Sequence, residues 1–356
     1  MNSRNQALDV LRGVAILLVF GNHLTYYHVW NRAGWIGVDL FFVLSGFLVS
    51  SLLFQEYKAN GDLNIDRFIL RRGLKIWPSF YALIVAVSAV ALWHGLSWKI
   101  VVKAFAFWSL FLQNYWGGPD ITSHTWSLCV EEHFYLMLPL LLWWLIQGEN
   151  RLHFIPGICA VLMAACLTMR VLTPLGTSPV LSQTHLRIDS LFCGVALGYW
   201  FHFRQQIFTR LSNWRWMPIL AVCPLPAFIF EEHTRLMQGV GITFLMCGFS
   251  LLVAWAVPRQ PWKLLGPLAS VGRYSYSIYI WHLPIVRWLR GDCFVSFWSC
   301  VLLCIAAGVV MAKLIEFPAL HLRERLLPQR STADCIPVPE IVEVKGANAT
   351  GLCSHA

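Results

Sequence analysis

Long hydrophobic runs recur along almost the whole chain. They lie near residues 8–28, 35–54, 76–94, 127–146, 153–172, 187–202, 217–231, 239–257, 274–289 and 294–316. About 20 apolar residues in an α-helix cross a hydrocarbon core of about 30 Å, and a helix satisfies its own backbone hydrogen bonds there. The pattern therefore predicts an all-α fold, a polytopic integral membrane helical bundle of about ten transmembrane helices.

One further apolar run, residues 101–116, decides the orientation of everything after it. If it does not cross the membrane, most basic residues in the loops lie on the same side as the N-terminus, and if it does cross, the balance reverses. Basic loops favour the cytoplasm. We therefore expect this run to be one additional short interfacial or re-entrant segment, with both termini cytoplasmic and the protein in the bacterial inner membrane.

Composition agrees with this class of protein. Hydrophobic residues make up 57% of the chain and charged residues 13%, and the mean hydropathy is +0.59. The formal net charge of +9 is explained by loop topology, so we expect the lipid bilayer and no nucleic acid as a partner. The eleven cysteines lie mostly in apolar runs without repeated CxxC spacing, so we expect neither a disulfide framework nor a metal site.

The domain organisation is simple. We expect residues 1–322 to form one membrane domain, because no stretch before residue 320 reads as a separate soluble unit. Residues 323–356 are polar, contain prolines and lack helical periodicity, so we expect a cytoplasmic, largely disordered tail.

The first hydrophobic run contains two residues that hydrocarbon does not favour, Arg12 and His23. Polar groups inside a span are costly unless they face a protein interior or a wet cavity. Their separation corresponds to about three helical turns, or roughly 16 Å, so they share one face of the helix. The predicted orientation places Arg12 near the cytoplasm and His23 toward the outside.

Further polar residues fall at defined depths. Charged residues from three other spans share the depth of His23, and one histidine lies nearer the middle of the membrane: Asp39, Glu131, Glu132, Arg187, Asp189 and, in the middle, His282. A shared polar cavity is the economical explanation. At the cytoplasmic side Arg71, Arg72 and Lys75 lie close in depth to Arg12, which predicts a phosphate-binding mouth because guanidinium groups suit phosphate oxygens.

Simpler interpretations stand beside these. Arg12 can extend to the lipid headgroups, the basic run at 67–75 can serve only topology, and His282 can be a hydrogen-bonded core residue. The stretch "GVDLFFVLSGF" can be a small-residue packing face, although Ser45 within it is also a candidate pore-lining residue. The adjacent pair of carboxylates at 131–132 has no common structural explanation.

Several motifs in order resemble one family. They are "LDVLRGVAILLVFGNH", "GVDLFFVLSGFL", "RRGLKIWP", "HTWSLCVEEHFYLMLP", "LRIDSLFCG", "VGRYSYSIYIWHLP" and "LIEFPAL". Together they resemble membrane-bound acyltransferase family 3, whose members O-acylate cell-envelope polysaccharides and other acceptors, usually from acetyl-CoA. Two positions depart from the family pattern: Lys75 stands where a second arginine is usual, and His133 where glutamine is frequent.

The resemblance implies an O-acyltransferase that moves an acyl group, most simply acetyl, from acyl-CoA to a hydroxyl of a carbohydrate or glycolipid acceptor. It implies that Arg12, Arg71, Arg72 and Lys75 bind the donor. His23 would act as general base or carry the acyl group, oriented by Asp39, Glu131 or Glu132, while Ser45, Arg187, Asp189 and His282 line the passage. No metal is required. A transporter or flippase that uses the same charged layer as a relay is the alternative, and the oligomeric state stays open.

Overall fold

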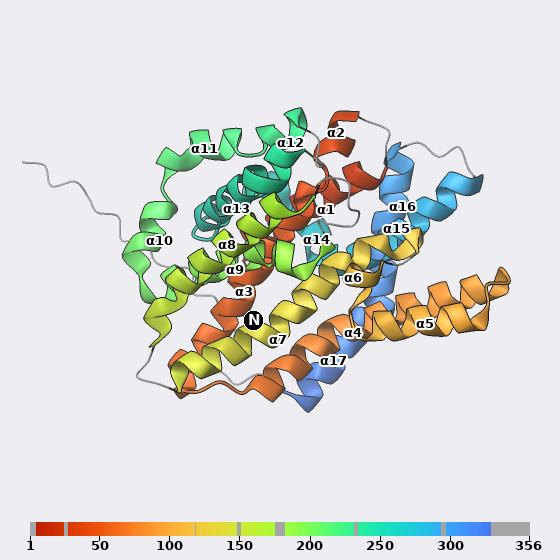
Figure 1. Cartoon of the computed structure of the whole chain (residues 1–356), viewed down its shortest axis with the longest axis horizontal. Helices are drawn as coiled ribbons and strands as arrows, with labels where there is room; N and C mark the ends of the chain where they lie inside the picture. The colour runs from red at the N-terminus through yellow and green to blue at the C-terminus, as the bar shows by residue number, and fades with distance from the viewer. Residues whose placement is uncertain are drawn as a thin grey trace, which may run out of the picture.

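A computed structural model describes residues 5–24, 28–117, 119–147, 151–174, 182–230, 234–292 and 297–328. Among these residues the regular structure is helical throughout, as predicted (Figure 1). The longer helices coincide with the predicted spans: α1 Gln6–His23, α3 Ile36–Asn60, α4 Ile65–Trp93, α7 Trp126–Ile146, α8 Ile155–Leu172, α9 Thr184–Phe203, α13 Ile242–Ala256, α15 Ser275–Asp292 and α16 Phe297–Met311.

Six helical segments among the described residues are long and apolar enough to cross a membrane: Trp30–Asn60, Ile65–Trp93, Asp120–Ile146, Arg151–Leu172, Met237–Ala256 and Phe297–Leu326. Helices α1, α9 and α15 have 18, 20 and 18 residues, but their polar residues lower their hydropathy. The chain is thus a polytopic helical membrane protein.

One predicted span is interrupted. The described part of the predicted span 217–231, up to residue 230, contains two short helices, α11 Met217–Val222 and α12 Leu225–Ile229, on either side of Pro224. Proline has no backbone N–H, so a helical hydrogen bond is missing at this position and the helix is interrupted.

The segment after α4 turns back on itself. Gly95 adopts a positive φ of 81°, and α5 Trp98–Ser109 then lies alongside α4 (Figure 1). Tyr81 near the middle of α4 donates a hydrogen bond to the Ser109 carbonyl at 3.0 Å, and Phe80 stacks on Phe111 at 4.6 Å. Helix α5 therefore returns only about halfway along α4.

The C-terminal helix reaches past the predicted domain boundary. Residues 312–316 form a π-helical turn, η7 Ala312–Glu316, and α17 Phe317–Leu326 continues from it. The boundary predicted at residue 322 thus lies inside α17, and α17 packs against α4. The part of the expected tail (323–356) that follows residue 328 lies outside the described residues.

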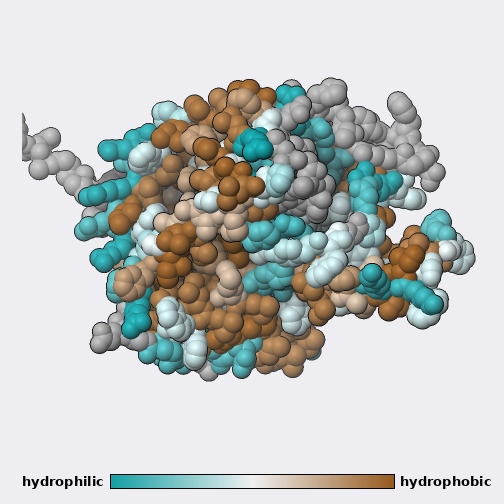
Figure 2. All heavy atoms as spheres, viewed as in Figure 1, coloured by the Kyte–Doolittle hydropathy of each residue, from teal (hydrophilic) through white to brown (hydrophobic). Residues whose placement is uncertain are grey.

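Hydrophobic side chains cover large parts of the surface, as a lipid-facing bundle requires (Figure 2). Val85 on α4 is 56% exposed and Val161 on α8 is 69% exposed. Such contiguous apolar surface is unfavourable in water and favourable in hydrocarbon.

Close packing of α3 against α9 forms the centre of the bundle. A Cβ atom added at Gly46 would lie 1.9 Å from the Leu191 carbonyl oxygen, and one at Gly194 would lie 2.3 Å from the Val43 carbonyl oxygen. Small residues at helix contacts permit such approach inside membranes. The packing interpretation of the "GVDLFFVLSGF" stretch is thus correct for its second glycine.

We predict that Gly46→Ala lowers the free energy of unfolding by about 1–3 kcal/mol, because the methyl group overlaps a backbone carbonyl that cannot move alone. Gly157→Ala is the matched control, since a Cβ there meets nothing within 4 Å. Thermal unfolding of the two purified variants provides the measurement. Equal melting temperatures for both variants would show that the α3–α9 contact is looser than described.

Candidate functional site

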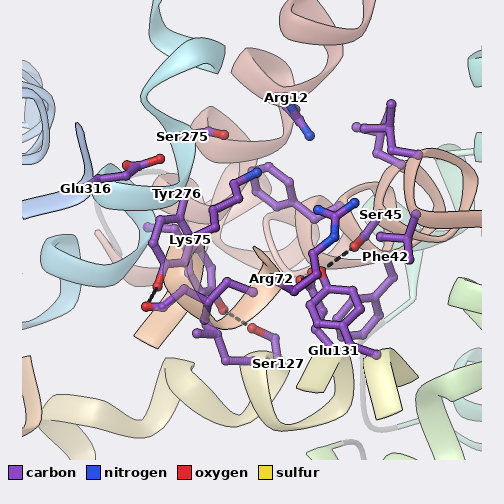
Figure 3. A pocket seen from close by; sticks show the side chains of 18 of the residues that line it. Arg12, Phe42, Ser45, Arg72, Lys75, Ser127, Glu131, Ser275, Tyr276 and Glu316 are labelled. Atoms are coloured by element: carbon purple, nitrogen blue, oxygen red, sulfur yellow. Dashed lines mark hydrogen bonds between the residues drawn. The ribbon is translucent and has the colours of Figure 1, made fainter. Parts of the chain in front are cut away.

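A cavity of about 300 Å³ opens between the helices that carry the predicted donor-binding residues. Its wall includes residues of α1, α3, α4, α7, α15 and α17, and of α14 Gly266–Arg273. The polar side chains around it are Arg12, Ser45, Arg72, Lys75, Ser127, Glu131, Tyr135, Arg273, Ser275, Tyr276, Tyr279, Glu316 and Arg323. Segments that are distant in sequence therefore converge on one space (Figure 3).

Cationic groups gather on one part of this wall. The side chains of Arg12 from α1 and of Arg72 and Lys75 from α4 point toward one another across the cavity (Figure 3). Arg273 and Arg323 also line it. Asp9 neighbours Arg12, with 3.5 Å between carboxylate and guanidinium. The excess of cations over the carboxylates of the wall suits an anionic ligand.

Glu131 lies among these cations and belongs to a hydrogen-bonded chain. The Tyr135 hydroxyl donates to the Glu131 carboxylate at 2.5 Å and lies 2.8 Å from the Ser45 hydroxyl. The guanidinium of Arg72 lies 5.7 Å from the centre of the Tyr135 ring. The predicted residues Ser45, Arg72 and Glu131 are thus brought together through a tyrosine that the sequence did not single out.

Glu316 and Ser277 form a second polar contact beside the cavity. The Ser277 hydroxyl donates to the Glu316 carboxylate at 2.6 Å, and the Tyr276 hydroxyl donates to the Ile76 carbonyl at 2.6 Å. Glu316 ends the π-helical turn η7, a deviation from α-helix that often accompanies functional sites. These contacts tie α15 to α4 and to the C-terminal span.

A tyrosine and a serine close the end of the cavity away from the arginines. Ser127 and Tyr279 line the cavity, and their hydroxyl oxygens lie 2.7 Å apart. The Tyr279 hydroxyl also donates to the His124 carbonyl at 2.7 Å. The Tyr279 ring thus forms part of the wall between the cavity and the residues behind it.

Histidines occupy the space behind this wall. The His282 ring lies 5.5 Å from the Tyr279 ring, 5.0 Å from His124 and 5.1 Å from His23, between ring centres. His23 ends α1, and its helix also carries Arg12 near the other end of the cavity. The predicted pair therefore lies along one helix that borders the cavity, but the cavity wall itself does not include His23.

The remaining charged residues of the predicted layer form a separate network. Arg187 pairs with Asp39 at 2.7 Å, and Arg170 pairs with Asp189 at 2.7 Å. The Ser190 hydroxyl also donates to Asp39 at 3.1 Å, and all these side chains are buried. The shared cavity expected for the whole layer is thus divided, because opposite charges on α3, α8 and α9 neutralise one another instead of facing the cavity.

Glu132 also lies apart from the main cavity. It lines a second cavity of about 310 Å³ together with His133 and Trp77, and the Trp77 indole N–H donates to its carboxylate at 3.3 Å. Arg72 and Tyr135 line both cavities. Adjacent positions on a helix point about 100° apart, which is why the two neighbouring glutamates face different spaces.

Arg71 is engaged by the C-terminal helix. Its guanidinium lies 3.2 Å from the Glu324 carboxylate and donates to the Leu327 carbonyl. Arg71 and Arg72 are adjacent, so helical geometry directs only one of them into the cavity.

Sequence reasoning missed His124, Tyr135 and Tyr279. Each lies in a motif from which other residues were predicted to belong to the site. Tyrosine and neutral histidine also occur in ordinary protein cores, so their presence in a span does not by itself indicate a site. Among the residues the structure describes, no group of three or more histidine, cysteine or acidic residues is arranged to hold a metal ion.

Comparison with known proteins identifies the family of the chain. A family model described as an acyltransferase domain matches residues 5–316. The peptidoglycan O-acetyltransferase OatA of Listeria monocytogenes is 28% identical over 307 residues, which cover 79% of this chain and 49% of the relative. YrhL of Bacillus subtilis, named as a putative peptidoglycan O-acetyltransferase, is 29% identical over 310 residues, which cover 78% of this chain and 48% of the relative.

The chain spans about half the length of these curated relatives. No solved structure matches it. The family match covers every helix that lines the main cavity except α17, which begins one residue after its end. The resemblance to acyltransferase family 3 is therefore confirmed, and the chain belongs to that family.

Proposed function

We propose that this protein is an integral membrane O-acyltransferase that moves an acyl group, most simply acetyl, from acyl-CoA to a hydroxyl of a cell-envelope carbohydrate or glycolipid. The observation that carries the proposal is the placement of Arg12, Arg72 and Lys75 at one cavity whose wall includes Tyr279, with His282 and then His23 behind that ring. The three cations suit the phosphates of an acyl-CoA donor, and an imidazole behind the cavity wall suits the thioester at the other end of that molecule.

The donor enters from the cytoplasmic side in this proposal. Its phosphates meet Arg12, Arg72 and Lys75, because guanidinium and ammonium groups form strong charge-assisted hydrogen bonds with phosphate oxygens. Arg71 contributes charge nearby while it remains paired with Glu324. The pantetheine arm then extends along the cavity toward Tyr279, and the thioester reaches His23 when the Tyr279 ring moves aside.

The transfer step follows ordinary acyl chemistry. The acceptor oxygen attacks the thioester carbonyl carbon while His23 takes the hydroxyl proton, the C–S bond breaks, and His23 returns the proton to the CoA sulfur. The products are the O-acyl ester and free CoA. An acyl-His23 intermediate is the variant of this scheme in which the imidazole itself attacks first. In this proposal Glu131, which lines the cavity, is the acidic partner, because Asp39 is paired with Arg187.

The membrane arrangement and the acceptor complete the proposal. We infer about ten crossings, both termini in the cytoplasm and the bacterial inner membrane as the location, which puts His23 toward the outside. The names of the relatives support peptidoglycan or a related envelope glycan as acceptor. Mass spectrometry of envelope glycans with and without the gene tests this: a gain of one acetyl group with the gene is expected, and identical glycans would contradict it.

The alternative class is a transporter or flippase that uses the charged layer as a relay. Release of free CoA from acetyl-CoA by the purified protein, dependent on an acceptor, distinguishes the two. A transporter would move its substrate across a vesicle membrane without consuming the thioester.

We predict that Arg72→Ala raises the KM for acetyl-CoA at least tenfold, because a charged hydrogen-bond donor worth about 1.5–3 kcal/mol is lost from the cavity. Arg67→Ala is the control: Arg67 lies on the same helix but donates to the Pro328 carbonyl outside the cavity. The CoA-release assay at varied acetyl-CoA measures both. A similar KM in the two variants would remove Arg72 from donor binding.

We predict that His23→Ala reduces transfer by about 10²–10⁴-fold, the range of general acid–base catalysis, while the Kd for CoA changes less than about twofold. His94→Ala, at the exposed end of α4, should retain full activity. Single-turnover transfer and equilibrium CoA binding are the measurements. Normal transfer by the His23 variant would discard the scheme.

A further inference from the structure

Two buried histidines beside His23 have a ring nitrogen without a hydrogen-bond partner. His124 is 2% exposed and His282 is 0% exposed. The Nδ1 atom of His124 and the Nε2 atom of His282 are both buried and unpaired. Buried polar atoms are nearly always satisfied, so each such atom asks for an explanation.

The partners of the other ring nitrogens fix the protonation of both rings. His124 Nε2 donates to the Ile280 carbonyl at 3.0 Å, and His282 Nδ1 donates to the Tyr279 carbonyl at 2.5 Å. A carbonyl only accepts, so these nitrogens carry the protons. In the neutral rings the unpaired nitrogens are therefore both hydrogen-bond acceptors.

A proline explains why the His124 contact exists. Pro284 lies within α15 and has no N–H, so the carbonyl four residues earlier, that of Ile280, lacks its helical partner. His124 supplies that partner from η1 Asp120–Thr125. The ring is thus held with its acceptor nitrogen in a fixed position by a feature of the helix backbone.

We propose that His124 and His282 form the subsite that binds the hydroxyl groups of the acceptor next to His23. Two neutral imidazole acceptors in rings 5.0 Å apart suit neighbouring O–H donors of a sugar, or water when the acceptor is absent. Since His282 also lies 5.1 Å from His23, a hydroxyl bound there is next to the proposed base. The inference rests on the proposed function and names its acceptor-binding residues.

Access to this subsite differs from access to the donor cavity. Tyr279 stands between the cavity and the histidines, whereas His23 is partly exposed on its own side. The Tyr279 ring would thus separate the bound donor from the subsite until it moves aside.

Two conservative substitutions remove the unpaired ring nitrogens but keep the hydrogen bonds made by the other ring nitrogens. His124→Gln retains an N–H that reaches the Ile280 carbonyl, and His282→Asn retains one that reaches the Tyr279 carbonyl, but both lose the ring acceptor. The reverse exchanges, His124→Asn and His282→Gln, are the matched controls, because they sacrifice the structural hydrogen bond. The probe is the N-acetylglucosamine–N-acetylmuramic acid disaccharide with acetyl-CoA and the full-length protein.

We expect His124→Gln and His282→Asn each to raise the KM for the disaccharide about five- to tenfold, with unchanged CoA binding and unchanged melting temperature. The control variants should instead lower the melting temperature. An unchanged disaccharide KM in both test variants, or an equal loss of CoA binding, would overturn the proposal.

A binding assay tests the subsite separately from the proposed acyl transfer. If the wild-type protein releases no CoA, calorimetric titration with the disaccharide in the presence of CoA replaces the kinetic assay. Binding by the wild type that weakens in both test variants would then support the subsite although the reaction is wrong. Equal binding in all three proteins would overturn it.

Discussion

The cost of placing a charge inside a membrane-spanning bundle governs this structure. A buried ion must be neutralised by a partner or must face a wet cavity. The described helices use both solutions. Asp39 and Asp189 are neutralised by arginines of neighbouring helices, whereas Arg12, Arg72 and Lys75 face the main cavity. The first group links neighbouring helices, and the second gives the cavity wall more cations than carboxylates.

The same constraint is consistent with a site in two parts that follow one another along α1, a cationic part and a histidine part. Helix α1 carries Arg12 beside the cavity and His23 about three turns farther along. Between them α15 contributes Tyr279 to the cavity wall and His282 to the space behind it. A donor held by its phosphates and a hydroxyl held by imidazoles would therefore meet only where these helices adjoin.

Periodicity and charge in the sequence were sufficient for the helical fold, for most helix positions and for grouping Arg12, Arg72 and Lys75, but they assigned Glu131 to the layer of His23, whereas it lines the cavity among these cations. They could not determine which charged residues pair with one another. Depth assigns Asp39 and Glu131 to one layer, but only the packing of α3 against α9 brings Arg187 to the aspartate. Likewise, adjacent glutamates or arginines cannot be assigned to a cavity before the rotation of their helix is known. The contribution of Pro284 to the position of His124 also depends on tertiary contact.

The central claim is that one cavity holds the donor by its phosphates and directs its thioester to His23. A cryo-EM map of the full chain with a non-hydrolysable acetyl-CoA analogue tests this most directly. The account predicts phosphate density against Arg12, Arg72 and Lys75, with a displaced Tyr279 ring and the acyl carbon in contact with the His23 ring. Phosphate density away from these three cations, or an acyl group still separated from His23 by Tyr279, would contradict it.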